Sequence, residues 1–178
     1  MIFCSNVNAQ KFDGYYITNS NDTIKCSFDV RVNIFDSKIF EKASVKNKVK
    51  VLNVDNKKIV FKPNEIRSFF IKGTKAGDFK FVSIENDNNF YHEVIKGRLS
   101  YYKLYRQNSG GALGALIAEG IYLSKDQKLI EVNPLNLRKA LSKQIEDYEE
   151  LYIKWIDSDK YYKLNQFEEV VNLYNEHF

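Results

Sequence analysis

The chain is dominated by short runs of alternating apolar and polar residues, separated by turn-forming residues. Such runs are typical of half-buried β-strands, because successive side chains of a strand point to opposite faces of a sheet. Ten of these runs occur in succession, at 12–18, 23–30, 48–51, 58–62, 66–71, 79–84, 90–95, 98–106, 120–124 and 128–132. The links between them are mostly short, which favours antiparallel neighbours. The sequence therefore predicts an antiparallel sheet that curls into a roll, a sandwich or a barrel.

Two of the links have the composition of hairpin turns. Asn19-Ser20-Asn21-Asp22 separates the first two runs, and Asp55-Asn56 lies between 48–51 and 58–62. Asn and Asp tolerate positive φ and bond to their own backbone, so both links are predicted to be tight turns.

The pattern changes to a helical one at Asn133-Pro134, where Asn is a good N-cap and Pro needs no partner for a missing N–H. Two segments with the form of a capping box, Asp147-Tyr148-Glu149-Glu150 and Asn165-Gln166-Phe167-Glu168, predict two further helix starts. Apolar residues recur at helical spacing: Leu137, Leu141, Ile145 and Tyr148, then Leu151, Tyr152, Trp155 and Ile156, then Phe167, Val170, Val171 and Tyr174.

These patterns together predict an α+β fold, with about ten strands followed by two or three C-terminal helices. A chain of 178 residues is long enough to bury most of its apolar surface in one core. We expect residues 10–178 to form a single α+β domain with one core, β-rich over 10–132 and helical over 133–178.

The charges are unevenly distributed along the chain. Residues 38–80 contain 12 Lys and Arg against 4 acidic residues, whereas residues 144–178 contain 9 acidic residues against 3 Lys. We expect the two segments to neutralise each other within one fold. The alternative is that the basic segment forms a surface for an anionic partner, which it would attract over a long range.

The N-terminus has features of a secretion signal. Val7 and Ala9 are compact residues of the kind that a signal peptidase accepts, which places the cleavage before Gln10. We interpret residues 1–9 as the end of a signal peptide whose beginning is missing from this chain; the alternative is a short, frayed cytoplasmic N-terminus. No later stretch of 18 or more apolar residues occurs, so we expect no transmembrane span.

Several motifs that span most of the chain form a recognisable pattern: Lys11-Phe12-Asp13-Gly14-Tyr15, Thr18, Asp22-Thr23-Ile24-Lys25-Cys26, Phe90, Val94-Ile95-Lys96-Gly97 and Val171-Asn172-Leu173-Tyr174-Asn175. With these motifs the chain resembles uncharacterised exported proteins of Bacteroidota, in which a signal ending in Ala-Gln leads into a "GYI-T-GDTI" hairpin. The resemblance implies export and a cell-envelope setting, and no known chemistry. Asn21 and Cys26 replace two glycines of that pattern, and we expect Cys26 to be a small buried apolar residue rather than a nucleophile.

An apolar, glycine-rich segment at 109–118 lies between two predicted strands, 98–106 and 120–124. It lacks the Gly-Lys-Ser/Thr ending of a phosphate-binding loop. Three interpretations stay open: a long loop folded back on the core, a surface that touches a partner or a membrane, or a short helix. The candidate binding residues here are Leu113, Leu116 and Ile117.

A tyrosine-rich run at 96–106 is the strongest candidate for ligand binding. Alternation places Tyr101, Lys103 and Tyr105 on one face, where they would stack on bases or sugars while neutralising phosphates. The alternative is that tyrosines simply suit strands and that the cationic residues protect a sheet edge. Export makes nucleic acid a disfavoured partner.

The sequence shows no constellation of catalytic, cofactor-binding or metal-binding residues. Only two histidines occur, His92 and His177, and no paired spacing suggests a zinc site. We expect His92 to be a half-exposed strand residue. Neighbouring acidic residues such as Glu149 and Glu150 would point about 100° apart on a helix, so they resemble a solvated face rather than a catalytic pair.

The expected function is therefore that of an exported protein, periplasmic or on the cell surface, which acts as a non-enzymatic binding or structural module. Its partner would be an envelope protein or a glycan. The alternative is a cytoplasmic domain that binds an anionic polymer such as nucleic acid through its basic segment, with the candidate residues Lys46, Lys48, Lys50, Lys57 and Lys58.

Overall fold

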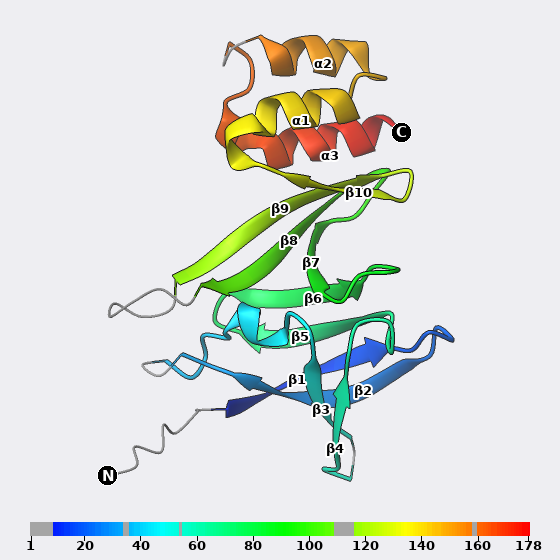
Figure 1. The fold of residues 1–178 in the computed structure, drawn as a ribbon, viewed down its shortest axis with the longest axis vertical. Coiled ribbons are helices and arrows are strands. Elements are labelled where there is room, and N and C mark those ends of the chain that lie inside the picture. Colours follow the sequence, from blue (N-terminus) through cyan, green and yellow to red (C-terminus); the bar gives the residue numbers. More distant parts are fainter. Residues whose placement is uncertain (1–8, 34–35, 54, 109–115, 158–159) are drawn as a thin grey trace. The chain divides into compact units, whose positions relative to one another are not determined.

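The computed structural model describes residues 9–33, 36–53, 55–108, 116–157 and 160–178 (Figure 1). The described strands form one open antiparallel sheet in the order β10-β9-β8-β7-β6-β5-β1-β2-β3-β4, which confirms the predicted α+β fold. The strands are β1 (Ala9–Ile17), β2 (Thr23–Arg31), β3 (Val49–Leu52), β4 (Lys58–Phe61), β5 (Ser68–Thr74), β6 (Gly77–Ser83), β7 (Phe90–Ile95), β8 (Leu99–Asn108), β9 (Leu116–Lys125) and β10 (Lys128–Val132). The helices are α1 (Leu137–Gln144), α2 (Glu149–Ile156) and α3 (Phe167–His177), with 3₁₀ turns η1 (Lys42–Val45), η2 (Pro134–Asn136) and η3 (Leu164–Gln166).

The chain divides into two compact units, each with a hydrophobic core of its own. Unit 1 comprises residues 1–92 and 104–118, and unit 2 comprises residues 93–103 and 119–178. The buried apolar side chains of the described residues form two clusters, one in each unit, so the expectation of one core is wrong. The assignment of residues 10–178 to a single domain stays a prediction.

Several turns of the sheet contain asparagine or aspartate in the left-handed region, as the sequence predicts. Asn21 has a φ of 70° in the β1–β2 hairpin, and Asn56 has a φ of 57° in the β3–β4 hairpin. Asn21 therefore adopts the conformation for which the resembling sequences use glycine. Asp126 and Gln127 both have positive φ between β9 and β10, as a two-residue turn of type I′ requires.

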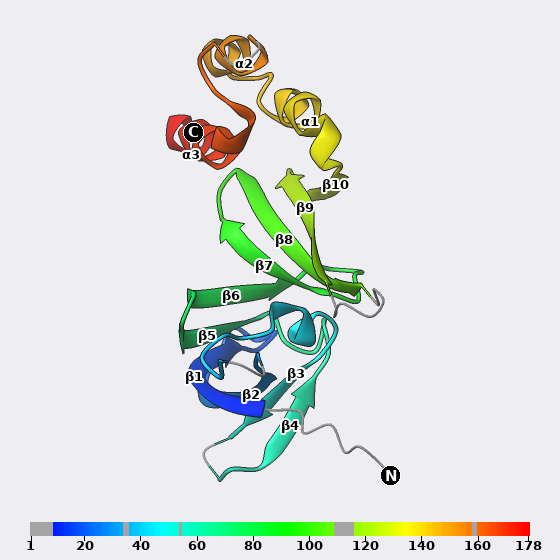
Figure 2. The ribbon, with the colours of Figure 1, turned by 90° about the vertical axis from the view of Figure 1, so that its left-hand side faces the viewer.

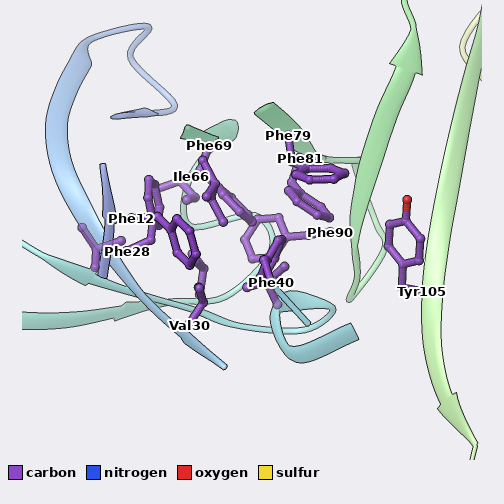
Figure 3. Packing of buried hydrophobic residues seen from close by; sticks show 14 of the residues in the cluster. Phe12, Phe28, Val30, Phe40, Ile66, Phe69, Phe79, Phe81, Phe90 and Tyr105 are labelled. Atoms are coloured by element: carbon purple, nitrogen blue, oxygen red, sulfur yellow. The ribbon is translucent and has the colours of Figure 1, made fainter. Parts of the chain in front are cut away.

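Unit 1 is built around an aromatic core that alternation along β5 and β6 delivers to one face of the sheet (Figure 3). Phe69 is fully buried; its ring stacks on Phe81 with centroids 5.0 Å apart and meets the edge of Phe90 at 4.9 Å. Offset and edge-to-face pairs of this kind add about 0.5–1.5 kcal/mol to the area that each ring buries. The cluster comprises Phe12, Phe28, Val30, Val32, Phe40, Val45, Val49, Val51, Ile66, Phe69, Ile71, Phe79, Phe81, Phe90 and Tyr105.

Unit 2 contains the three helices α1, α2 and α3 (Figure 2). Their apolar side chains form one buried cluster with residues of the strands. The predicted helical stripes are largely confirmed: Leu137, Leu141, Ile145, Leu151, Trp155, Phe167, Val170, Val171 and Tyr174 are buried, and Tyr148 and Tyr152 are half-buried. Ile156, predicted to belong to the second stripe, is exposed. The Trp155 side chain is also fully buried, and its Nε1 donates to the backbone oxygen of Arg138 at 2.9 Å. Among the described residues, no helix is long and apolar enough to cross a membrane.

The helix caps agree with the prediction only in part. Asn133 caps η2, because its Oδ1 accepts from the backbone N–H of Leu135 at 2.9 Å. The predicted cap at Asp147 is wrong: α2 begins at Glu149 without a side-chain cap, because Asp147 is bonded elsewhere. The predicted cap at Asn165 is wrong as well.

The turn before α3 is closed two residues earlier than predicted. The Gln166 side chain there accepts from the backbone N–H of Lys163 at 3.0 Å. The final helix then begins at Phe167, and its N-cap residue makes no side-chain capping bond.

Two motifs of the resemblance meet in unit 2. The Asn175 side chain accepts from the backbone N–H of Leu99 at 2.8 Å and donates to its carbonyl oxygen at 2.9 Å. A Cβ atom at Gly97 would overlap this amide, so glycine leaves the space that α3 needs to bind the start of β8. The role of both residues here is structural.

Gly14 allows β1 to approach its neighbours closely. Its Cα lies opposite Cys26 of β2 and Ile71 of β5, so it is paired on both sides. A Cβ atom here would overlap the carbonyl oxygen of Phe70 and lie 2.7 Å from the Phe28 ring. Backbone cannot move aside as the end of a flexible side chain can, so only glycine fits.

We expect Gly14→Ala to lower the free energy of unfolding by about 3 kcal/mol or more, because overpacking against backbone forces the strands apart. Urea unfolding followed by circular dichroism measures this change. Gly73→Ala is the control: its Cβ would meet no atom within 4 Å, and its φ of +72° limits the cost to about 1–2 kcal/mol. A Gly14→Ala protein as stable as the control would contradict the close approach.

Candidate functional site

A polar pocket of about 240 Å³ opens on unit 1 where β2, η1, the start of β3 and the end of β8 meet. Buried side chains of Val30 and Val45 contribute to its lining. The pocket is lined by Asp29, Val30, Arg31, Ala43, Ser44, Val45, Asn47, Lys48, Lys50 and Gln107.

The cationic residues of this pocket follow from strand alternation in β3. Val49 and Val51 are fully buried in the core, so the intervening Lys50 points to the other face and is exposed. Lys48 precedes the strand and is exposed as well. Arg31, at the end of β2, brings a third exposed cation to the pocket.

Asp29, the one carboxylate among the described lining residues, is already paired. Lys58 Nζ lies 2.6 Å from Oδ2 of Asp29, whose side chain is 16% exposed. Within the described part of the chain, Arg31, Lys48 and Lys50 show no ion pair of this kind. The pocket therefore has an excess of positive charge that no described acidic side chain neutralises.

Ser44 adds a polar group without a partner. Its backbone N–H donates to Glu41 at 2.8 Å, which shapes η1. Its Oγ is buried and makes no hydrogen bond within the described ranges. Buried polar groups are nearly always satisfied, and an unsatisfied one calls for a water, an ion or a functional role.

An aromatic cluster lies beside η1. Lys42 Nζ stands over the rings of Phe79 and Tyr105, 4.8 and 4.9 Å from their centroids. The hydroxyl of Tyr105 lies 2.8 Å from Nδ1 of His92, which is half-buried as predicted. Sequence reasoning missed this cluster, because its members come from four separate segments.

The predicted binding face of β8 is only partly accessible. Tyr101 and Tyr105 are 0% and 3% exposed, so the expectation that these tyrosines form an exposed surface is wrong. Tyr101 instead meets the edge of Phe167 in the core of unit 2, with ring centroids 4.9 Å apart. Lys103 is partly exposed and lies 3.8 Å from carboxylate oxygens of both Glu119 and Glu168.

The other predicted binding residues belong to the glycine-rich segment. Leu113 lies outside the described residues. Leu116 and Ile117 are the first residues of β9, so the described end of this segment is strand rather than helix.

Other hollows on the described surface are larger than the pocket of unit 1. A groove of about 490 Å³ on unit 2 is lined by Arg138, Lys139, Ser142, Lys143, Glu146, Tyr152 and Ile156. The Arg138 guanidinium is engaged there, donating to the backbone oxygens of Trp155 and Tyr162. Among the described residues, no group of three His, Cys, Asp or Glu side chains is placed to hold a metal ion.

Cys26 is half-buried on β2 and packs against the core of unit 1. Burial raises the pKa of its thiol from 9.0 to about 11. At neutral pH the thiol stays protonated, which is the form with little nucleophilic or metal-binding capacity.

A satisfied polar cluster in unit 2 contrasts with the pocket. The Asp147 carboxylate accepts from the Tyr174 hydroxyl at 2.9 Å, from Lys125 Nζ at 2.9 Å and from Arg98 Nη2 at 2.9 Å. Lys125 also donates to the backbone oxygen of Gln144 at 2.7 Å. Each of these charged side chains has a partner of opposite sign. The cluster therefore has a structural role, in which it connects strands to helices within unit 2.

The cluster shifts the pKa values of its members. Burial opposes the ionisation of Asp147, but hydrogen bonds from Lys125 and Tyr174 outweigh it and hold the pKa of that carboxyl below its usual range. Burial likewise disfavours the charged form of Lys125, and its hydrogen bonds with Tyr174 and Asp147 overcome this and raise its pKa.

We expect Asp147→Asn to lower the urea midpoint at pH 7. Because the pKa of Asp147 is lowered by folding, its contribution is present above the unfolded value of about 3.9 and is lost as the pH falls through the folded-state pKa. The urea midpoint of the wild type should therefore decrease as the pH is lowered below about 4. The urea midpoint of Asp147→Asn should decrease less over the same pH range. Asp126→Asn, in an exposed turn, is the control; parallel pH curves for wild type and Asp147→Asn would refute the role of the carboxylate.

Comparison with known proteins finds no matching family model, no matching curated protein and no matching solved structure.

Proposed function

We propose that this protein is an exported, non-enzymatic binding module of the cell envelope, and that its binding site is the basic pocket of unit 1. The observation that carries the proposal is the set of three cations, Arg31, Lys48 and Lys50, around a small pocket in which the one described carboxylate is paired with Lys58. Unpaired cations near one another repel, and an anionic ligand would remove that repulsion.

The distribution of ion pairs supports a free positive charge on unit 1. The basic segment 38–80 lies entirely in unit 1, and its lysines Lys58 and Lys75 pair with Asp29 and Asp36 of the same unit. The acidic segment 144–178 lies entirely in unit 2, where Asp147 pairs with Arg98 and Lys125. These pairs form within the units, which favours the basic surface over mutual neutralisation of the two segments.

The envelope setting rests on the N-terminal sequence. The compact residues before Gln10 fit signal-peptidase cleavage, and the hairpin that follows resembles exported proteins of Bacteroidota. In such a compartment the anionic partners are acidic or phosphorylated glycans, lipid head groups and acidic envelope proteins.

If the pocket binds anions, substitution of its lysines should weaken that binding. Titration of the protein with inorganic phosphate, sulfate and acetate, followed by amide NMR shifts, should perturb Ser44, Lys48 and Lys50. Lys48→Gln/Lys50→Gln should weaken phosphate binding by about tenfold or more, because charge-assisted hydrogen bonds contribute about 1.5–3 kcal/mol. Lys25→Gln/Lys62→Gln removes equal charge from exposed positions outside the pocket and should bind as wild type does. Equal losses in both variants would contradict a localised site.

A different variant addresses the cytoplasmic alternative. Lys57 and Lys58 lie at the β3–β4 hairpin, close in sequence to the pocket lysines, and a polymer would contact all four. Lys57→Gln leaves the ion pair between Lys58 and Asp29 intact. Single-stranded DNA that binds at 150 mM salt with a steep salt dependence, and more weakly to Lys57→Gln, would favour the anionic polymer over the proposed small-anion site.

Export predicts a defined mature N-terminus. When the protein is expressed from its native locus, mass spectrometry of the envelope fraction should find a chain that begins at Gln10. A chain that keeps residues 1–9 and fractionates with the cytoplasm would contradict export, whatever the pocket binds.

A further inference from the structure

Resting on the anion site proposed above, we propose that the pocket of unit 1 recognises the dianionic phosphate of a phosphomonoester. The charge of the lining is the first reason. The described lining holds three cations, Arg31, Lys48 and Lys50, and its carboxylate, Asp29, is already paired with Lys58, so at least two positive charges are left without a counter-charge. A phosphomonoester carries about two negative charges at neutral pH, whereas a carboxylate or a sulfate monoester carries one.

The arrangement of donors is the second reason. They come from four segments of the chain: Arg31 from β2, Ser44 from η1, the two lysines around the start of β3, and Gln107 from β8. A planar carboxylate presents its lone pairs in a single plane, while the three terminal oxygens of a phosphate point in three directions. Donors that converge from several segments match the second shape better. The guanidinium supplies two parallel N–H groups, and the lysines act as point charges.

The size of the pocket limits what else is bound. Its volume of about 240 Å³ is below the roughly 300 Å³ at which pockets for drug-sized ligands begin. The pocket therefore takes the phosphate group, and the alcohol that carries it extends into solvent. A sugar phosphate and a phosphate-bearing lipid head group share this chemistry.

Ser44 lines the pocket, and its hydroxyl oxygen is buried without a hydrogen-bond partner in the described part of the chain. In the proposed complex the Ser44 side chain turns so that this hydroxyl reaches the ligand. A phosphate oxygen accepts from a serine hydroxyl through a short, charge-assisted bond. Ser44→Ala should therefore weaken phosphate binding without lowering the stability of the free protein, because the native hydroxyl makes no bond that is lost.

The experiment compares three ligands of one sugar: glucose 6-phosphate, glucose 6-sulfate and glucuronate. Amide shifts of Ser44, Lys48 and Lys50 report binding at pH 7.5 and pH 5.5. We expect the phosphate to bind about tenfold or more tightly than the other two at pH 7.5. Its affinity should fall about fourfold at pH 5.5, because the second pKa of a phosphomonoester is about 6.

The sulfate arm controls for titration of the protein. The charged groups that line the pocket are Asp29, Arg31, Lys48 and Lys50, and His92 contacts Tyr105 on the neighbouring strand. Any change in their charge affects the sulfate and phosphate arms alike, so a fall confined to phosphate belongs to the ligand.

Three outcomes separate the two proposals. Phosphate preference with the expected pH dependence, lost in Arg31→Gln and kept in Lys25→Gln/Lys62→Gln, supports the phosphomonoester. Equal binding of all three ligands overturns the phosphomonoester and leaves the anion site standing. Absence of shifts at the pocket with any anion overturns both. Urea midpoints equal to that of the wild type show that the variants fold. If Arg31→Gln does not fold, Lys50→Gln takes its place in the experiment.

A final arm identifies the source of the phosphate. Phosphatidylcholine vesicles with phosphatidic acid should sediment the protein if the phosphate belongs to a lipid, and glucose 6-phosphate should then compete. Binding of glucose 6-phosphate without vesicle sedimentation identifies a soluble or glycan phosphate. Both results agree with the phosphomonoester.

Discussion

Pairing of β1 with β5 is the constraint on which the rest of unit 1 depends. These strands are more than fifty residues apart in sequence, and β1 joins the hairpins β1–β2 and β3–β4 to the remainder of the sheet. The pairing requires a residue without a side chain at Gly14, where β1 lies against the Phe70 backbone. Once it forms, the aromatic side chains of β5 and β6 are buried, and β2 and β3 bring Arg31, Lys48 and Lys50 to one pocket.

The charged residues around Asp147 have partners of opposite charge, whereas the cations of the pocket have none among the described residues. Asp147 accepts a hydrogen bond from Tyr174 and forms ion pairs with Lys125 and Arg98, and these interactions stabilise the folded state. Lys48 and Lys50 are exposed and have no ion pair among the described residues; they lie on either side of the buried Val49, at the start of β3. Unpaired cations near one another, and a buried hydroxyl without a hydrogen bond, lower the stability of the folded protein. Natural sequences tolerate such unfavourable groups mainly at functional sites.

Much of the fold was predictable, because its signals are local. Asn21 and Asn56 mark turns through their own backbone preference, and the stripe from Phe167 to Tyr174 follows from helical period alone. The site was only partly predictable. Lys48 and Lys50 were among the candidate cations, but Arg31, Ser44 and Gln107 have no local signal that joins them to the lysines. Tyr101 and Tyr105 misled for the same reason: alternation assigns residues to faces of a strand and does not say which face a second layer covers.

The sequence by itself determined the order and type of the elements, the segregation of charge and the turn positions, because each of these depends on residues within a few positions of one another. Only the tertiary structure decided which strands become neighbours, that the apolar residues form two cores, and that three cations share one pocket. Those outcomes depend on contacts between segments far apart in the chain. Their energy comes from burial and close packing, which no local pattern specifies.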